Sequence, residues 1–128
     1  MFQNTKNSKQ QGDVGLGSAI AYYTSLGYTV SIPLNDSQQY DLLVDEEGDI
    51  KRVQVKTSYH KTPEGVYRVC LKTSGGNKSF TTIKPFDSKT VELLFVLAED
   101  GSRYSVPTSE FSATNNLNLG KKMEKFKI

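Results

Sequence analysis

The chain has 128 residues and a formal net charge of +2 at pH 7. This length suits one domain with one core, and so small a net charge excludes a uniformly basic surface, so any nucleic-acid site must come from local clusters. The single cysteine, Cys70, excludes a disulfide within the chain, and no stretch is apolar enough for a signal sequence or a membrane span. We therefore expect a single cytoplasmic domain over residues 1–128 with no membrane partner.

The first predicted element is a helix that follows a polar segment over residues 1–11. It extends from Gly12 to Leu26, with Asp13 as its N-cap and Gly27 as the residue that ends it. Its apolar residues fall roughly on one stripe, which predicts that the helix packs against a sheet or a core. These residues are Val14, Ala19, Ile20, Tyr23 and Leu26.

A short strand over residues 28–32 ends at Pro33, and a polar loop over residues 35–39 follows it. Gln38 and Gln39 of this loop are candidates for contact with a phosphate or a sugar of DNA. The solubility of an exposed loop explains both glutamines equally well, so the loop by itself does not decide between these interpretations.

Residues 40–57 predict a β-hairpin, because two runs with alternating apolar residues flank an acidic turn that contains a glycine. If Asp45 pairs with Ile50 across the turn, Asp41 lies directly opposite Gln54 on the same face. Lys56 follows on that face, about 7 Å further along the strand. The apolar residues behind this polar face are Leu42, Val44, Val53 and Val55.

A carboxylate, an amide and an ammonium on one small face suit metal-assisted hydrolysis of a phosphodiester. Mg²⁺ prefers oxygen ligands, here the Asp41 carboxylate, the Gln54 amide oxygen and the backbone carbonyl of Val55. The ion would lower the pKa of a bound water, and Lys56 would orient that water or neutralise the developing negative charge. The same alternation is also typical of the solvent-facing side of a half-buried strand, so spacing alone leaves both interpretations open.

After the hairpin, a turn-rich connection contains His60, the only histidine, and a lone loop histidine is more often solvated than catalytic. A strand is predicted over residues 66–72 and a flexible loop over residues 72–79. The glycine and lysine spacing of this loop does not match a P-loop, but lysines among glycine and hydroxyl residues suit contacts with a DNA backbone. Together with two positions on the hairpin strand, the candidate DNA contacts are Arg52, Thr57, Lys72, Ser74, Asn77 and Lys78.

Residues 91–98 form a nearly continuous apolar run, which is typical of a central strand covered on both sides. A turn follows, and residues 103–106 return as the hairpin partner of that strand. The tail over residues 115–128 is basic, and its Met123 and Phe126 are spaced as on one side of a short helix. The tail is compatible with a frayed helix, a DNA contact or an oligomer contact, and the sequence does not decide among these.

The order Asp41, twelve further residues, then Gln54-Val55-Lys56 resembles the Asp…(Asp/Glu)-x-Lys signature of the PD-(D/E)XK nuclease superfamily. Residues 40–44 and 52–57 look like one branch of it, the small homing endonucleases encoded in group I introns, in which Gln can replace the acidic residue. The archaeal-type Holliday junction resolvases are a more distant likeness. The resemblance extends over residues 12–111, and its specific part is the segment from Asp41 to Lys56.

The resemblance implies an α/β fold with a restriction-endonuclease-like core, in which an N-terminal helix accompanies a mixed, mainly antiparallel sheet. It implies a Mg²⁺-dependent endonuclease acting on double-stranded DNA, with Mn²⁺ able to substitute and with Asp41, Gln54 and Lys56 as the catalytic residues. In the related nucleases a glutamate just after the second glycine of the first helix helps to bind the metal. The matching position here is Leu16, and Asp13 is the nearby acid that would take over this role.

Other functions remain open at this point. A Holliday junction resolvase or a restriction-type nuclease would perform the same chemistry on another DNA substrate. A catalytically silent DNA-binding protein is the alternative of a different class, because a site with one clear carboxylate binds Mg²⁺ weakly. For a double-strand cut, one site per chain and a small DNA-reading surface predict a homodimer or a tetramer, with residues 117–128 as a candidate contact.

Overall fold

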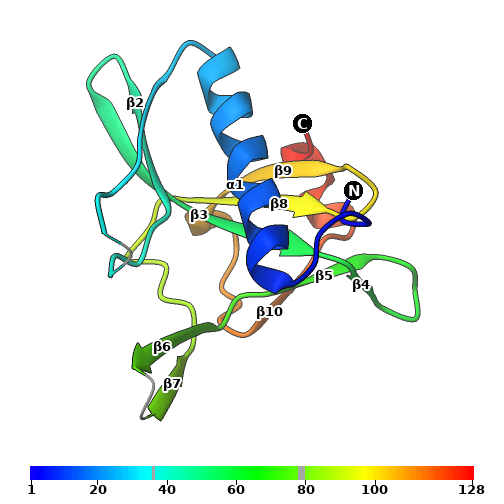
Figure 1. Cartoon of the computed structure of the whole chain (residues 1–128). Coiled ribbons are helices and arrows are strands. Elements are labelled where there is room, and N and C mark those ends of the chain that lie inside the picture. The colour runs from blue at the N-terminus through cyan, green and yellow to red at the C-terminus, as the bar shows by residue number, and fades with distance from the viewer. Residues whose placement is uncertain (36, 78–79) are drawn as a thin grey trace.

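The computed structural model of the chain describes residues 1–35, 37–77 and 80–128, and it does not describe the side chains of residues 74–77 and 80–82. Its centre is a five-stranded sheet with the strand order β1-β2-β3-β8-β9. The strand pair β3–β8 is parallel and the other three pairs are antiparallel, which confirms the predicted mixed, mainly antiparallel α/β fold (Figure 1). The strands are β1 (Thr29–Ser31), β2 (Leu42–Glu46), β3 (Asp49–Ser58), β8 (Leu93–Ala98) and β9 (Arg103–Pro107).

The hairpin β2–β3 has the predicted register, since Asp45 pairs with Ile50. Two residues connect the strands, and both Glu47 and Gly48 have positive φ, the backbone geometry that suits the twist of a two-residue hairpin. Asp45 Oδ1 accepts a hydrogen bond of 2.7 Å from the Gly48 N–H, which fixes the turn. Strand β3 is five residues longer than β2, so residues 54–58 of β3 pair with β8 alone.

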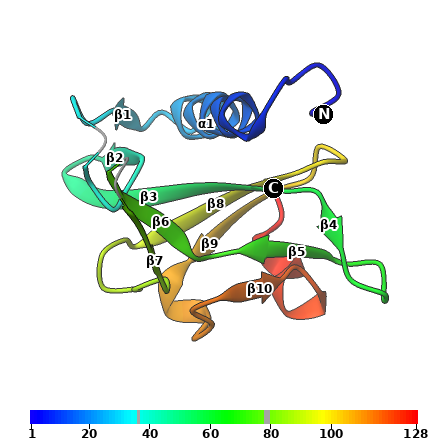
Figure 2. The same ribbon diagram turned by 60° about the horizontal axis from the view of Figure 1, so that its bottom comes forward.

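One face of the sheet is covered by α1 (Ser8–Ser25), which Figure 2 shows as a separate layer above the strands. Ala19 and Tyr23 of the helix are buried against the apolar side of the hairpin. The predicted N-cap was wrong, because the helix begins one turn earlier and Asn7 Oδ1 caps it by accepting 2.9 Å from the Gln10 N–H. The predicted end of the helix is confirmed by Gly27, which has φ +84°.

The opposite face is covered by a three-stranded antiparallel sheet with the order β10-β5-β4. Its strands are β4 (His60–Lys61), β5 (Tyr67–Cys70) and β10 (Asn116–Asn118). Two short 3₁₀-helices, η1 (Thr108–Glu110) and η2 (Lys121–Phe126), complete this side. The second core cluster lies between this layer and the central strands β8 and β9, so β8 is buried from both sides as predicted.

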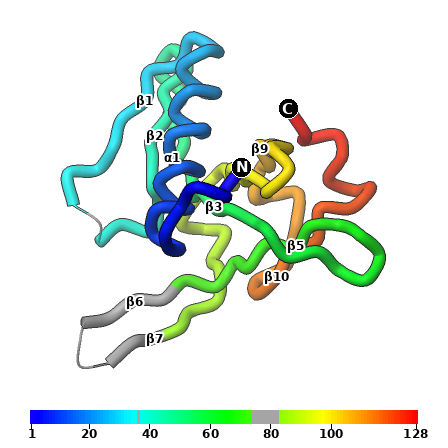
Figure 3. Tube along the Cα trace, turned by 45° about the vertical axis from the view of Figure 1, so that its right-hand side comes forward, coloured from blue at the N-terminus to red at the C-terminus, as the bar shows by residue number. Residues whose placement is uncertain are grey.

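The carboxyl-terminal segment is an integral part of this layer and not a frayed tail. Leu117, Leu119 and Met123 are buried in the second core cluster, and residue 127 forms a bridge with Tyr104 of β9. Figure 3 shows β10 beside β5 and the chain end returning toward β9. Most apolar residues of the segment 117–128 are therefore engaged inside the chain, whereas Ile128 is 42% exposed, and the contact of this segment with a second copy stays a prediction.

Residues 73–77 and 80–84 form a separate pair of strands, whereas the sequence predicted a loop over residues 72–79. Its strands are β6 (Thr73–Asn77) and β7 (Phe80–Lys84), and they pair antiparallel to each other (Figure 1). Two of the predicted DNA contacts, Ser74 and Asn77, lie on β6, where side chains are outside the described part, and Lys78 lies outside the described residues altogether. Among the helices that the structure describes, none is long and apolar enough to cross a membrane.

The packing of α1 on β3 depends on the absence of a side chain at Gly15. A Cβ atom there would lie 2.6 Å from Thr57 Cγ2 and 3.4 Å from Val55 Cγ1, whereas a Cβ atom at Gly17 would meet nothing within 4 Å. Beside this close approach, Gln11 Nε2 donates 2.8 Å to Thr57 Oγ1 and holds the threonine in place.

We expect Gly15→Ala to lower the free energy of unfolding by about 1–2 kcal/mol, because Thr57 cannot move away without losing its hydrogen bond. The matched change Gly17→Ala should raise it by about 0.5–1 kcal/mol, because alanine restricts the unfolded chain and favours the helix. Urea unfolding followed by circular dichroism measures both. Equal stabilisation by the two variants would show that α1 does not rest on β3 at this point.

Candidate active site

Asp41 lies where the chain leaves the ladder with β3, one residue before β2 begins. Its backbone N–H donates 2.8 Å to the Val53 carbonyl, and its carboxylate Oδ2 accepts 2.7 Å from the Val55 N–H. The carboxylate thereby takes the place of a strand partner for Val55. Oδ2 also accepts 3.2 Å from Gln54 Nε2, so the structure brings Asp41 and Gln54 together as the hairpin register predicts.

Lys56 extends the same face of β3, in the part of the strand that has no β2 partner. Its Nζ donates 3.3 Å to the backbone carbonyl of Lys72, which lies just beyond β5. Burial lowers the pKa of Lys56 below its ordinary value, and the charge of Asp41 opposes this shift. The ammonium is thus partly withdrawn from water and is held near a carboxylate by the strand geometry.

The pKa of the Asp41 carboxyl is raised above its ordinary value. Burial is the main cause, while the Val55 N–H, the charge of Lys56 and the Gln54 amide all act in the opposite direction. Burial therefore outweighs the three groups that favour the charged form, so ionising Asp41 costs more free energy in the protein than in water. A further positive charge nearby would lower this cost.

The donor set around Asp41 fits a hard divalent cation. Asp41 Oδ1 accepts no hydrogen bond from the described residues, and the Gln54 amide that donates through Nε2 keeps its oxygen as a possible ligand. Within the described ranges no group of three or more His, Cys, Asp or Glu side chains is close enough to hold a metal. The candidate ligands are one carboxylate and neutral oxygens, a set that suits an ion such as Mg²⁺, which retains several waters.

An open pocket of about 460 Å³ lies in front of Asp41. Gln38 is part of its lining, as expected of a residue near a substrate, whereas Gln39 is simply exposed in the same loop. Leu16 of α1 also lines the pocket, so the position that matches the glutamate of related nucleases shares this pocket with Asp41, but with an apolar side chain. The other lining residues are Ile32, Pro33, Leu34, Asn35 and Tyr40.

Asp13 is exposed on α1, three residues before Leu16 and so about 60° from it around the helix. It is not among the residues that line the pocket in front of Asp41. Its expected contribution to a metal site stays a prediction.

Arg52 and Thr57 have partners within the chain that the sequence did not indicate. The Arg52 guanidinium forms a salt bridge with Glu92, donates 3.0 Å to the Lys89 carbonyl, and so joins β3 to the start of β8. Thr57 faces α1, where it accepts the hydrogen bond from Gln11. Both predicted DNA contacts therefore make contacts that stabilise the fold, whereas the side chain of Lys72 is exposed beside the site.

Comparison with known proteins agrees with this geometry. A family model described as PD-(D/E)XK endonuclease matches residues 6–126. Among solved structures, the chain is similar to the bacterial homing endonuclease I-Ssp6803I, with 27% sequence identity, a TM-score of 0.75, and coverage of 90% of this chain and 79% of that one. No curated protein sequence gives a significant match.

The matched region includes α1, the whole central sheet and the segment that brings Asp41, Gln54 and Lys56 together. Both the resemblance of the hairpin motif and the expected restriction-endonuclease-like core are confirmed by these similarities. The chain belongs to the PD-(D/E)XK endonuclease family.

Proposed function

We propose that the chain is a Mg²⁺-dependent DNA endonuclease that cuts at a specific site, in the manner of a homing enzyme. The observation that carries this proposal is the cluster of the Asp41 carboxylate, the Gln54 amide and the Lys56 ammonium at the part of β3 that pairs with β8 alone. The family supports a nuclease, and its members generally use divalent metal ions. The similarity to a homing endonuclease supports the site-specific role.

Each residue of the cluster has a distinct task in phosphodiester hydrolysis. Asp41 and the Gln54 oxygen would hold the cation, with the Val55 carbonyl as a further ligand. When bound, the ion supplies a water of lowered pKa and positive charge beside the phosphate. Lys56 places an ammonium next to the same position, where it stabilises the negative charge that develops on the phosphoryl oxygens, or orients the attacking water. Mn²⁺ accepts the same oxygen ligands and would substitute for Mg²⁺.

Glutamine at position 54 suits a site whose carboxylate is already difficult to ionise. The Gln54 amide donates to Asp41, and this hydrogen bond favours the charged form of the aspartate. A glutamate in its place would put a second negative charge beside the first when no cation is present. We infer that Gln54 orients one oxygen toward the metal while it reduces the cost of ionising Asp41.

The substrate that fits this proposal is double-stranded DNA, cut by two copies of the chain. One hairpin supplies one site, and each site cuts one strand, so a double-strand break requires a homodimer or a tetramer. Because Leu117, Leu119 and Met123 are buried in the protein's own core, a contact between copies through the segment 117–128 would use its exposed lysines and Ile128.

A second candidate function is a DNA-binding protein without nuclease activity. Leu16 supports it, because the pocket wall facing Asp41 is apolar where related nucleases have a glutamate. A single carboxylate binds Mg²⁺ weakly, so this alternative predicts DNA binding without cleavage even at high Mg²⁺.

Asp41→Ala and Lys56→Ala should each reduce DNA cleavage at least about 100-fold and leave DNA affinity within a few-fold, because both groups act on the reacting phosphate. The assay uses a plasmid carrying the gene's own genomic neighbourhood, with and without Mg²⁺. Asp49→Ala and Lys51→Ala are matched controls, since these residues pair with each other at 3.6 Å at the opposite end of β3. Undiminished cleavage by either site variant would show that the active site lies elsewhere, and no cleavage by the wild type would favour the silent DNA-binding protein.

Gln54→Glu should bind Mg²⁺ about tenfold more tightly than the wild type, because it adds a charged ligand beside Asp41. Gln54→Ala should need more Mg²⁺ for half-maximal cleavage. Calorimetric titration of Mg²⁺ into the DNA-free protein measures the first effect, and cleavage as a function of Mg²⁺ concentration measures the second. A Gln54→Ala variant with unchanged metal dependence would reduce Gln54 to an ordinary surface residue of the strand.

The raised pKa of Asp41 predicts how stability depends on pH in the absence of metal. The folded state favours protonated Asp41, so the wild type should lose stability relative to Asp41→Asn as pH rises from the ordinary aspartate pKa to the raised folded value. Above that value the difference should stay constant. Urea unfolding in EDTA across this range provides the measurement, with exposed Asp49→Asn as the control. Added Mg²⁺ should then stabilise the wild type more than Asp41→Asn, and a stability difference that does not change with pH would contradict the assignment.

A further inference from the structure

The outer face of the sheet β10-β5-β4 is polar and hollowed. Along β5, Tyr67 and Val69 point into the core, whereas Arg68 and Cys70 are exposed. The pairing register aligns Arg68 with His60 on one side and with residue 118 on the other. An open groove of about 510 Å³ lies over this face and is lined by residues 57–61, Arg68, Cys70 and Asn116.

The groove offers cations and an aromatic surface, and its lining contains no carboxylate. Arg68 is oriented by its Nε, which donates 3.0 Å to Asn118 Oδ1, and its terminal nitrogens make no hydrogen bond with the described residues. Lys61 pairs with Tyr67 on the edge strand β4 and lies over its ring at 5.0 Å, so its ammonium lies at the edge of the sheet on the side of that ring, while Lys61 also lines the groove. Two carboxylates interact with the charges of these cations, Glu64 with Arg68 and Asp100 with Lys61. Both lie in the flanking turns and neither lines the groove.

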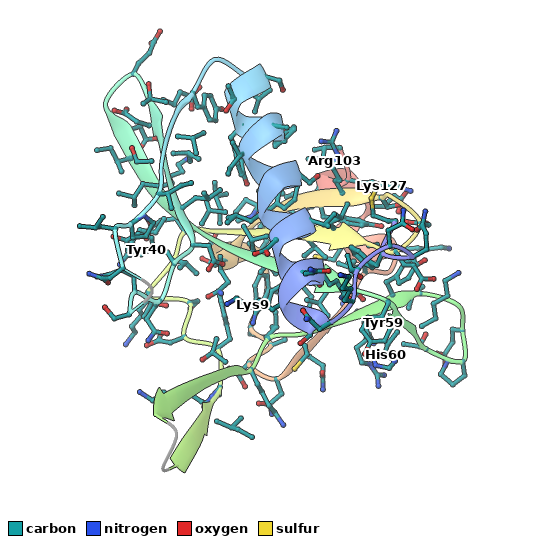
Figure 4. All side chains as sticks on the ribbon, in the orientation of Figure 1. Lys9, Tyr40, Tyr59, His60, Arg103 and Lys127 are labelled. Carbon is teal, nitrogen blue, oxygen red and sulfur yellow. The ribbon has the colours of Figure 1, made fainter. Side chains whose placement is uncertain are left out.

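Tyr59 and His60 add a flat surface at the rim. Their rings lie 4.3 Å apart at an angle of 34°, and Figure 4 shows them side by side just beyond the end of β3. Tyr59 is 52% exposed, a high value for so large an aromatic side chain. An exposed ring pair beside an arginine, with a lysine at the edge of the sheet, is a combination that suits a nucleic-acid strand, with the cations on phosphates and the rings against a base or a sugar.

The groove adjoins the candidate active site along the chain. Its lining includes Thr57, the residue after Lys56, and Cys70. Two residues further, the Lys72 carbonyl accepts the hydrogen bond from Lys56. Arg68 and Lys72 are four residues apart, about 13 Å along an extended chain, which corresponds to about four base pairs along a duplex axis.

We propose that this groove binds the backbone of the cleaved DNA strand a few nucleotides from the scissile phosphodiester, with Arg68 and Lys61 on phosphates and Tyr59 and His60 against the adjoining nucleotide. This inference rests on the proposed nuclease function and adds the path of the substrate. It also gives a role to the single histidine, which contacts the strand and takes no part in the reaction. The affinity that the groove contributes is electrostatic and independent of base sequence.

The first test measures DNA affinity in EDTA with a fluorescein-labelled duplex of about 30 base pairs, long enough to cover several times the expected contact. Arg68→Gln combined with Lys61→Gln should weaken binding about tenfold and lower the slope of log K against log salt by about 1.8, which is about 0.9 for each lost phosphate contact. Lys121→Gln combined with Lys122→Gln removes the same charge from exposed positions of η2 and is the control. An equal loss in both double variants would overturn the proposal.

The second test uses Cys70 as a probe, because it is the only cysteine and it is exposed in the groove. Bound duplex should slow the reaction of Cys70 with a maleimide at least about tenfold, and should do so only at DNA concentrations that saturate binding. The Arg68/Lys61 variant should need correspondingly more DNA for the same protection. Saturating DNA that leaves the maleimide reaction unchanged would show that the duplex occupies another face.

Plasmid cleavage separates failure of the groove from failure of the nuclease function. In the Arg68/Lys61 variant the plasmid concentration for half-maximal cleavage should rise about tenfold with an unchanged maximal rate, because the groove binds substrate equally before and during the reaction. Cleavage by the wild type with no protection of Cys70 overturns the groove and leaves the endonuclease intact. Protection of Cys70 without any cleavage overturns the endonuclease and leaves the groove as the surface of a DNA-binding protein.

Discussion

The hydrogen bond from the Val55 N–H to the Asp41 carboxylate connects the fold to the chemistry. The ladder between β2 and β3 ends at the Leu42–Val53 pair, so the N–H of Val55, which points toward β2, would lack a partner. Asp41 accepts a hydrogen bond from this N–H, although burial of its carboxyl disfavours the charged form. The arrangement of the candidate site therefore follows from a difference in strand length: β3 continues past β2, and side chains on the part of β3 that pairs with β8 alone lie around Asp41.

The same hairpin explains what the sequence could and could not predict. Its register depends on a local turn and on alternating apolar residues, so the juxtaposition of Asp41 and Gln54 was predictable from the motif itself. The helix start was missed although Asn7 and Gln10 have the spacing of a capping pair, because Asp13 offered a second N-cap signal further along the chain. The salt bridge of Arg52 with Glu92 joins residues 40 positions apart, and alternation within one strand carries no information about it.

Other differences have the same origin in non-local pairing. Strand β6 contains two adjacent glycines, which lower the strand propensity of that segment. Its pairing with β7, which a local pattern does not show, makes it a strand. In the carboxyl-terminal segment, the alternation of Leu117 and Leu119 with asparagines is a usable strand signal that the lysine-rich composition obscured. The alternation of Arg68 and Cys70 with Tyr67 and Val69 likewise indicates that β5 has a polar outer face. The groove over that face also depends on the neighbouring strands β4 and β10, and β10 comes from a distant segment.

The parallel pairing of β3 with β8 also determines when the site can exist during synthesis. The site end of β3 has its only ladder with β8, which begins at residue 93, and the carbonyl that holds Lys56 lies in the intervening chain. A ribosome-bound chain that stops after the β2–β3 hairpin contains every residue of the motif but lacks the strand that supports it. Parallel pairs between distant segments form late, because the chain must lose the entropy of closing the loop before the contacts that compensate this loss can form. The nascent protein would therefore contain every residue of the candidate site well before the strand that supports them is available.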